Sequence, residues 1–205
     1  MNNKQHVQLT KVTDYDFVSA EKDKYGVFYS RDGLRLIDVD NKTFSCREYR
    51  IKESVKIICD YAFAGCSTII NVIIPDSVEV IGERAFFFCS SLQNMKLPQY
   101  LIYCGSSVFS KCSSLQTIEL PISMKSINKS MFSGCSSLKN ILIPSSVTRI
   151  GRAAFYQCKS FKEIIIPKSV QYIDRLAFRY CRNLKAVYIP DSVKRIGMYA
   201  FCLCI

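Results

Sequence analysis

Cysteine is the residue type with the most conspicuous chemistry in this chain, which holds eleven of them in 205 residues. Cysteine thiolates bind zinc and cysteine pairs form disulfides, but each use requires its own spacing. The sequence contains no Cys-x-x-Cys pair, and Cys202 and Cys204 are separated by a single residue. A zinc cluster is therefore not indicated, and we expect neither a metal site nor a cofactor.

Seven of the cysteines recur at a constant interval of 23 residues: Cys66, Cys89, Cys112, Cys135, Cys158, Cys181 and Cys204. Residues related in this way occupy equivalent positions in stacked coils, which lie about 4.8 Å apart. Stacked side chains point in the same direction, and this suits the torsion of a disulfide badly. We therefore predict buried, reduced thiols that pack as small apolar side chains.

Nucleophilic catalysis needs a general base beside the nucleophile, and this chain offers one histidine. That residue, His6, lies in an N-terminal segment that we expect to be frayed. The glycines occur singly and form no phosphate-binding loop. The sequence therefore predicts a protein that is not an enzyme.

The 23-residue interval extends to every proline of the chain: Pro75, Pro98, Pro121, Pro144, Pro167 and Pro190. An unbroken period of this length predicts a solenoid, in which each unit buries its apolar face against its neighbours. Within the unit Cys135–Gln157, the residues Leu138, Ile141 and Ile143 have the spacing of a short strand of a leucine-rich repeat. Pro144 ends this strand because it has no N–H to donate. Gly151 is predicted at a bend that requires positive φ.

A phenylalanine occupies one phase of every unit: Phe63, Phe86, Phe109, Phe132, Phe155, Phe178 and Phe201. An apolar residue at such a regular position is typical of a core. We predict a continuous aromatic spine inside the solenoid rather than a cofactor site.

Residues 1–42 do not repeat. Val27–Ser30 and Leu34–Val39 are apolar runs on either side of Arg31-Asp32-Gly33, which predicts a β-hairpin. A solenoid needs a distinct first unit to cover its end, so we interpret residues 1–42 as an N-terminal cap; a separate binding module is the alternative. Residues 43–205 are predicted to form a right-handed α/β repeat solenoid of about seven coils with short parallel strands.

The variable residues on the outward side of the strands form the candidate protein-binding face. Its central column contains Ile73, Lys96, Glu119, Leu142, Ile165 and Tyr188, and a basic column beside it contains Lys139, Lys162 and Lys185. Apolar anchors rimmed by lysines are typical of a protein-binding surface. The alternatives are solvated lysines beside a chance apolar strip, or self-association.

The net charge of +11 is unevenly distributed. Residues 1–42 and 43–119 are each balanced, whereas residues 120–205 hold fourteen Lys/Arg against three Asp/Glu. A basic half attracts acidic partners or polyanions. Its arginines, which a nucleic-acid ligand would also use, are Arg149, Arg152, Arg175, Arg179, Arg182 and Arg195. No recognised motif accompanies them, which argues against nucleic acid as the partner.

Two features bear on location and assembly. The first seventeen residues lack the apolar segment of a secretory signal, and no apolar run is long enough to span a bilayer, which predicts a cytoplasmic location.

The sequence stops one residue into a further unit, at Ile205, so we expect the strand at 185–189 to present an open edge. A longer array, or a homodimer that packs two such ends together, would cover it.

The repeated pattern Cys-x-Ser-Leu-x-x-Ile-x-Ile-Pro-x-Ser-Val-x-x-Ile-Gly-x-x-Ala-Phe resembles the BspA-like class of leucine-rich repeats over residues 43–205. That class is shared by surface proteins of mucosal bacteria and protist parasites. The resemblance implies a cell-surface, adhesin-like protein that recognises host matrix or cell-surface proteins. An intracellular scaffold is the alternative function, and polyanion or nucleic-acid binding through the basic half is a third.

Overall fold

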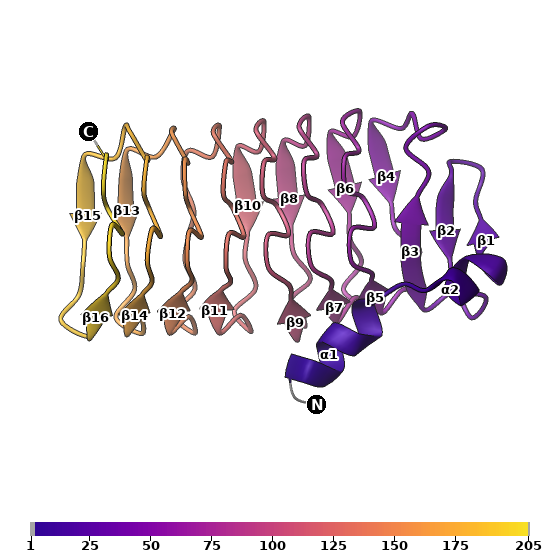
Figure 1. Ribbon diagram of the computed structural model, residues 1–205, viewed down its shortest axis with the longest axis horizontal. Helices are drawn as coiled ribbons and strands as arrows, with labels where there is room; N and C mark the ends of the chain where they lie inside the picture. The colour runs from indigo at the N-terminus through magenta and orange to yellow at the C-terminus, as the bar shows by residue number, and fades with distance from the viewer. Residues whose placement is uncertain (1–2, 205) are drawn as a thin grey trace.

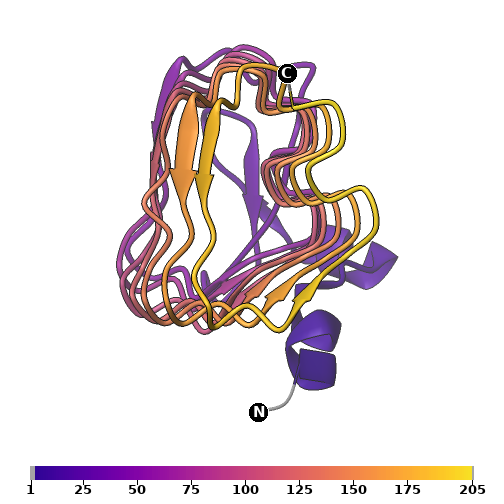
Figure 2. The same cartoon turned by 90° about the vertical axis from the view of Figure 1, so that its left-hand side faces the viewer.

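The structure, a computed structural model that describes residues 3–204, is a solenoid of about seven coils stacked along one axis (Figure 1). Viewed from the end, the coils superimpose, so each residue lies above its equivalents 23 positions away (Figure 2). Helices are confined to the N-terminal segment, as α1 (Asn3–Thr10) and α2 (Asp14–Val18). The described coils themselves consist of turns and the short parallel strands that the repeat pattern predicts, so the helical part of the expected α/β class is limited to α1 and α2.

One face of the coils, here called the strand face, is built from three-residue strands. Its first part is a parallel sheet of β4 (Glu48–Arg50), β6 (Asn71–Ile73), β8 (Asn94–Lys96) and β10 (Thr117–Glu119). Its second part is a parallel pair of β13 (Glu163–Ile165) and β15 (Ala186–Tyr188). In each pair the register is one repeat, so Ile165 lies beside Tyr188.

A second face, here called the basal face, carries two-residue strands. β5 (Ile57–Ile58), β7 (Val80–Ile81) and β9 (Tyr103–Cys104) continue a sheet that starts in the N-terminal segment. The later coils contribute a separate parallel sheet of β11 (Ser126–Ile127), β12 (Arg149–Ile150), β14 (Tyr172–Ile173) and β16 (Arg195–Ile196). Both faces are therefore interrupted in the middle of the solenoid.

Each interruption lies at a definite place in the chain. Residues 139–143 form no strand although the pattern predicts one there, and Ile141 is only partly buried. On the basal face, the Nδ2 amide of Asn128 donates to the carbonyl of Cys104 at 2.5 Å. In the neighbouring coils the backbone N–H of Gly105 or Gly151 makes the corresponding bond. A side chain thus replaces a backbone donor where β9 meets β11.

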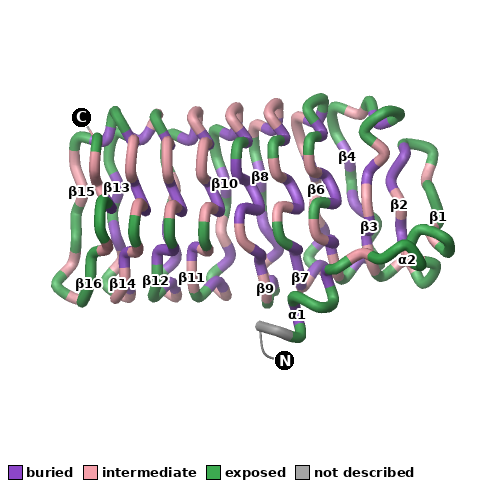
Figure 3. Tube along the Cα trace, in the orientation of Figure 1, coloured by how far each residue is buried: buried purple, intermediate pink, exposed green. Residues whose placement is uncertain are grey.

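The phenylalanine spine is present as predicted. Consecutive rings from Phe63 to Phe201 stack nearly parallel, with centroids 5.1 to 5.8 Å apart. Every ring from Phe63 to Phe178 is fully buried, and Phe201 in the last coil is half-buried. Buried segments recur at the same place in each coil of the tube in Figure 3. One apolar core therefore runs the length of the solenoid.

The predicted reason for the glycine at the bend is wrong. Gly151 does not have positive φ; instead, a Cβ there would lie 2.8 Å from the carbonyl oxygen of Ile127 and 2.9 Å from the nitrogen of Lys129. Close approach of two coils, and not positive φ, is therefore what favours glycine at residue 151. Positive φ occurs at two other positions of each coil, mostly in residues with side chains, such as Ala153 (φ 54°) and Gln157 (φ 60°).

The repeated cysteines are free thiols, and those before Cys204 are fully buried. The prediction that they act only as small apolar groups was incomplete, because they also donate hydrogen bonds. From Cys89 onward each Sγ lies 3.0 to 3.1 Å from the carbonyl oxygen of the phenylalanine 26 residues earlier. Each thiol therefore ties its coil to the spine of the preceding one.

The predicted hairpin is present at the N-terminal end. β2 (Val27–Tyr29) pairs antiparallel with β3 (Arg35–Val39), and β1 (Glu21–Lys22) extends it on the outer edge. β3 pairs parallel with β5, so the hairpin continues the basal sheet of the first coils. Side chains of β2 and β3 are buried in the common core. This is the arrangement expected of a cap; the division at residue 42 stays a prediction.

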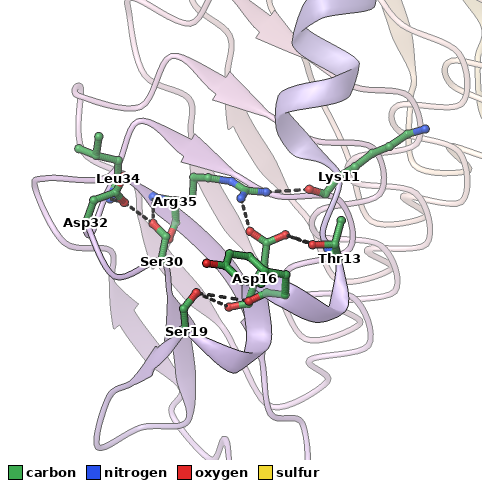
Figure 4. Close-up of polar contacts among 9 residues, drawn as sticks. Lys11, Thr13, Asp16, Ser19, Ser30, Asp32, Leu34 and Arg35 are labelled. Atoms are coloured by element: carbon green, nitrogen blue, oxygen red, sulfur yellow. Dashed lines mark hydrogen bonds and ion pairs between the residues drawn. The ribbon is translucent and has the colours of Figure 1, made fainter.

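Polar contacts hold the N-terminal segment to the hairpin (Figure 4). The Arg35 guanidinium pairs with the carboxylate of Asp16 and donates to the carbonyl of Lys11 at 2.7 Å. Asp16 also accepts from the N–H and hydroxyl of Thr13, at 2.8 and 2.9 Å. Burial raises the pKa of Asp16, but the Thr13 hydrogen bonds and the Arg35 charge outweigh it and lower that pKa.

The expectation of a frayed segment around His6 is wrong. His6 lies on α1, is 6% exposed, and stacks on Tyr103 of β9 with ring centroids 5.6 Å apart. The helix contacts β5 and β7, so it covers the basal face of the first coils. Apolar stacking on the solenoid therefore orders this segment.

Candidate protein-binding face

All nine residues predicted for the binding face lie on or beside the strand face. Eight of them are exposed, namely Lys96, Glu119, Leu142, Ile165, Tyr188, Lys139, Lys162 and Lys185. The ninth residue, Ile73 at the end of β6, is half-buried. The geometry divides the face into two halves, which meet at residues 139–143.

The later half is apolar. Leu142 is 86% exposed, Ile165 67% and Tyr188 62%, and they occupy successive coils. A hollow of about 400 Å³ lies between the strandless segment and β13, lined among others by Leu142, Glu163 and Ile165. Three large apolar side chains in one exposed row are unusual on a surface that faces only water.

The basic column runs alongside this apolar row. Lys139, Lys162 and Lys185 are exposed at the start of their coils, and the Lys185 N–H donates to the Lys162 carbonyl at 2.8 Å. Of these three side chains, none forms an ion pair within residues 3–204. No acidic side chain of the described residues therefore neutralises these three charges.

The earlier half is polar and hollowed. A depression of about 830 Å³ spans β4, β6, β8 and β10. Asn71, Asn94 and Thr117 line it, and the Thr117 hydroxyl donates to the Asn94 side-chain oxygen at 2.7 Å. Lys96 and Glu119 face each other across it at 3.9 Å. Sequence reasoning missed this depression, although the column of Asn and Thr at the 23-residue interval could have indicated it.

The arginines considered for a polyanion do not form one site. Arg149 and Arg195 lie on basal strands, and Arg152 and Arg175 follow such strands two residues later. Arg179 and Arg182 instead lie near Tyr180, with guanidinium-to-ring distances of 4.8 and 5.8 Å. Arg179 is also 5.5 Å from the ring of Tyr199. The folded chain therefore divides the six between two surfaces.

Residues 3–204 contain no cluster of three His, Cys, Asp or Glu side chains that could hold a metal ion. Neither described helix has the length and apolar character needed to cross a membrane.

The stacked 23-residue coils, each with a Leu/Ile strand motif and a buried phenylalanine, define a leucine-rich repeat solenoid. The sequence profile of the BspA type leucine-rich repeat region, in six copies, matches residues 39–161 and 89–205. The chain therefore belongs to the BspA type leucine-rich repeat family.

Solved structures agree with this assignment. A leucine-rich repeat protein from Eubacterium ventriosum shares 23% identity with a TM-score of 0.84, covering 91% of this chain and 50% of that one. The T. pallidum leucine-rich repeat protein shares 26% identity with a TM-score of 0.72, covering 87% and 86%. The chain thus spans about half the length of the first of these proteins. No curated protein sequence matches it.

Proposed function

We propose that this protein recognises a protein partner through the apolar half of the strand face. The observation that carries the proposal is the exposed row of Leu142, Ile165 and Tyr188, with a hollow at its start. Aromatic and aliphatic anchors at the centre of a contact, with charged residues at its rim, supply most of the binding energy in protein interfaces. The basic column supplies such a rim, and it favours a partner whose matching surface is acidic.

Membership of the BspA type family supports a proposal about location and ligand. The resemblance implies a location at the cell surface and a ligand among host matrix or cell-surface proteins, as for an adhesin. Labelling of intact cells tests this location. Antibody that stains unpermeabilised cells supports the adhesin, whereas signal that appears only after permeabilisation would favour an intracellular scaffold instead.

The double substitution Leu142→Asp with Ile165→Asp tests the face itself. We expect it to abolish capture from a panel of immobilised matrix proteins, because two charges would be buried in the contact. The melting temperature should hardly move, since both side chains are exposed in the free protein.

Ile122→Asp is the matched control, because Ile122 is 79% exposed and lies beyond the strands, after Pro121. It should bind like the wild type. Unchanged capture by the double variant would refute the proposed face. A large loss of stability would instead show that these two residues support the core.

A further inference from the structure

We propose a second interaction surface, on the basal face of the later coils, that binds a linear sulfated polysaccharide. This surface lies on a different side of the solenoid from the apolar row, so it does not depend on the function proposed above. It comprises the sheet of β11, β12, β14 and β16 together with the residues that directly precede these strands or follow them within two positions.

Seven cations gather on this surface, which we call the basal cation ladder: Lys125, Lys129, Arg149, Arg152, Arg175, Lys194 and Arg195. All seven side chains are exposed. Lys129, Arg152 and Arg175 occupy the same position in successive coils, directly after the column that contains Gly151. These three side chains therefore leave the backbone from positions one coil spacing apart, about 4.8 Å along the axis.

The protein neutralises little of this charge itself. Asp174 is the acidic partner on this surface; it receives two hydrogen bonds of 2.9 Å from Arg149 and lies 4.0 Å from Arg195. The remaining five cations have no ion pair among residues 3–204. Like charges stacked at one coil spacing repel each other, and a bound polyanion would relieve that repulsion.

The same positions in the earlier coils show that the fold does not require this charge. Asp60 and Glu83 occupy the column of Lys129, and Glu79 occupies the column of Lys125, where it pairs with Lys56 at 3.4 Å. Helix α1 covers that part of the basal face, whereas none of the described elements covers β11 to β16 (Figure 1). The exposed half of the face is thus the basic half.

The chemistry of the surface favours a sulfated polysaccharide over a nucleic acid. Single-stranded nucleic acids are held by aromatic side chains on which bases stack, in addition to basic residues. Of the eight residues in β11, β12, β14 and β16, only Tyr172 is aromatic; it is half-buried, and its ring centroid is 5.9 Å from the Arg149 guanidinium. A regular row of positive charges with no exposed aromatic ring on its strands is complementary to a polymer that carries regularly spaced sulfate groups and has no bases to stack.

Charge reversal on two faces provides the test. The variant Lys125→Glu, Lys129→Glu, Arg152→Glu removes three members of the ladder, and Lys139→Glu, Lys162→Glu, Lys185→Glu makes the same change in net charge on the strand face. Binding of a heparin oligosaccharide is measured by calorimetry at two salt concentrations. We expect the basal variant to bind at least about a hundredfold more weakly, since each cation near a dense anionic surface contributes about fivefold.

The strand-face variant should bind heparin nearly as the wild type does. Wild-type affinity should fall steeply with salt, and the basal variant should show a shallower dependence. Desulfated heparin should not bind, and single-stranded DNA of equal charge should bind more weakly. Absence of heparin binding, equal losses in both variants, or DNA that binds as tightly as heparin would each overturn the proposal. If charge reversal prevents folding, the corresponding glutamine variants give the same comparison with smaller losses.

Discussion

The interior spine and the outer strand face of this solenoid are built from the same 23-residue unit, yet they differ in how strictly it repeats. Along the spine, seven rings stack at nearly one distance, and backbone hydrogen bonds link Phe63, Phe86, Phe109, Phe132, Phe155 and Phe178 each to the following coil. On the strand face the sheet stops at β10 and resumes at β13. Its central column changes from half-buried Ile73 through a Lys–Glu pair to exposed Leu142.

This difference shows where the repeat is under physical constraint. A buried side chain contacts its equivalents in both neighbouring coils, so a change in one coil leaves a void or a clash in the next. An outward side chain contacts solvent on one side and can vary at little cost in stability. Positions that repeat therefore hold the fold, and positions that vary are those available for recognition.

The largest expected effect comes from opening the spine. Phe132→Ala should lower the free energy of unfolding by about 3–5 kcal/mol, because a fully buried ring between two parallel neighbours leaves a cavity. Leu142→Ala, on the exposed face, should cost no more than about 0.5 kcal/mol. Denaturant unfolding of both variants measures this. Similar losses of unfolding free energy in the two variants would contradict the proposed difference in constraint between the spine and the strand face.

A smaller effect is expected where coils approach closely. Gly151→Ala should cost about 1–3 kcal/mol, since its Cβ would overlap the backbone of the preceding coil. Gly134→Ala is the matched control. Its Cβ would meet Lys111 at an ordinary 3.5 Å, and Lys111 and Gln157 already adopt positive φ at that position. Because residue 134 has positive φ, the control carries left-handed strain of about 1–2 kcal/mol but no steric overlap, and it should cost less than Gly151→Ala. A cost for Gly151→Ala no larger than that of the control would contradict the close-approach explanation.

The smallest effect concerns the N-terminal segment, which polar contacts help to hold. Asp16→Asn should lower stability at pH 7 by about 1 kcal/mol, because it weakens the contacts with Arg35 and Thr13. The folded-state pKa of Asp16 is lowered, so its contribution is complete above the unfolded value of about 3.9 and is lost as pH falls through the folded value.

Thermal unfolding at several pH values checks this dependence. The wild type should lose stability as pH falls below about 4, and Asp16→Asn should lose less, so that the two converge in acid. Hydrogen bonds from Lys22 and Thr43 lower the pKa of Asp40 to about 2, so the wild-type decline should extend to that pH. A constant difference between wild type and variant would show that Asp16 does not act through its charge.

Much of the fold could be predicted because the residues that form its core recur at a constant interval in the sequence. The spacing of Cys135, Pro144 and Phe155 from their equivalents defined the coil, and the alternation around Gly33 defined the hairpin. The outward direction of Leu142, Ile165 and Tyr188 followed from strand geometry and agrees with their exposure. That these residues bind a partner stays a prediction.

Other features depended on contacts between coils that no pattern within one coil contains. Asn128 interrupts a sheet by bonding to Cys104, and His6 is ordered because it stacks on Tyr103, almost one hundred residues later. The 830 Å³ depression forms where β4, β6, β8 and β10 lie side by side, and Asn71, Asn94 and Thr117 of three neighbouring coils are among the residues that line it.

The amino-acid sequence by itself determined the solenoid, because a strict 23-residue period with apolar residues at fixed positions leaves one way to bury them all. Only the tertiary structure decided which variable residues of different coils lie together on one surface. Periodicity specifies a residue's place within its coil, whereas the break in the strand face and the position of α1 depend on how particular side chains meet between coils.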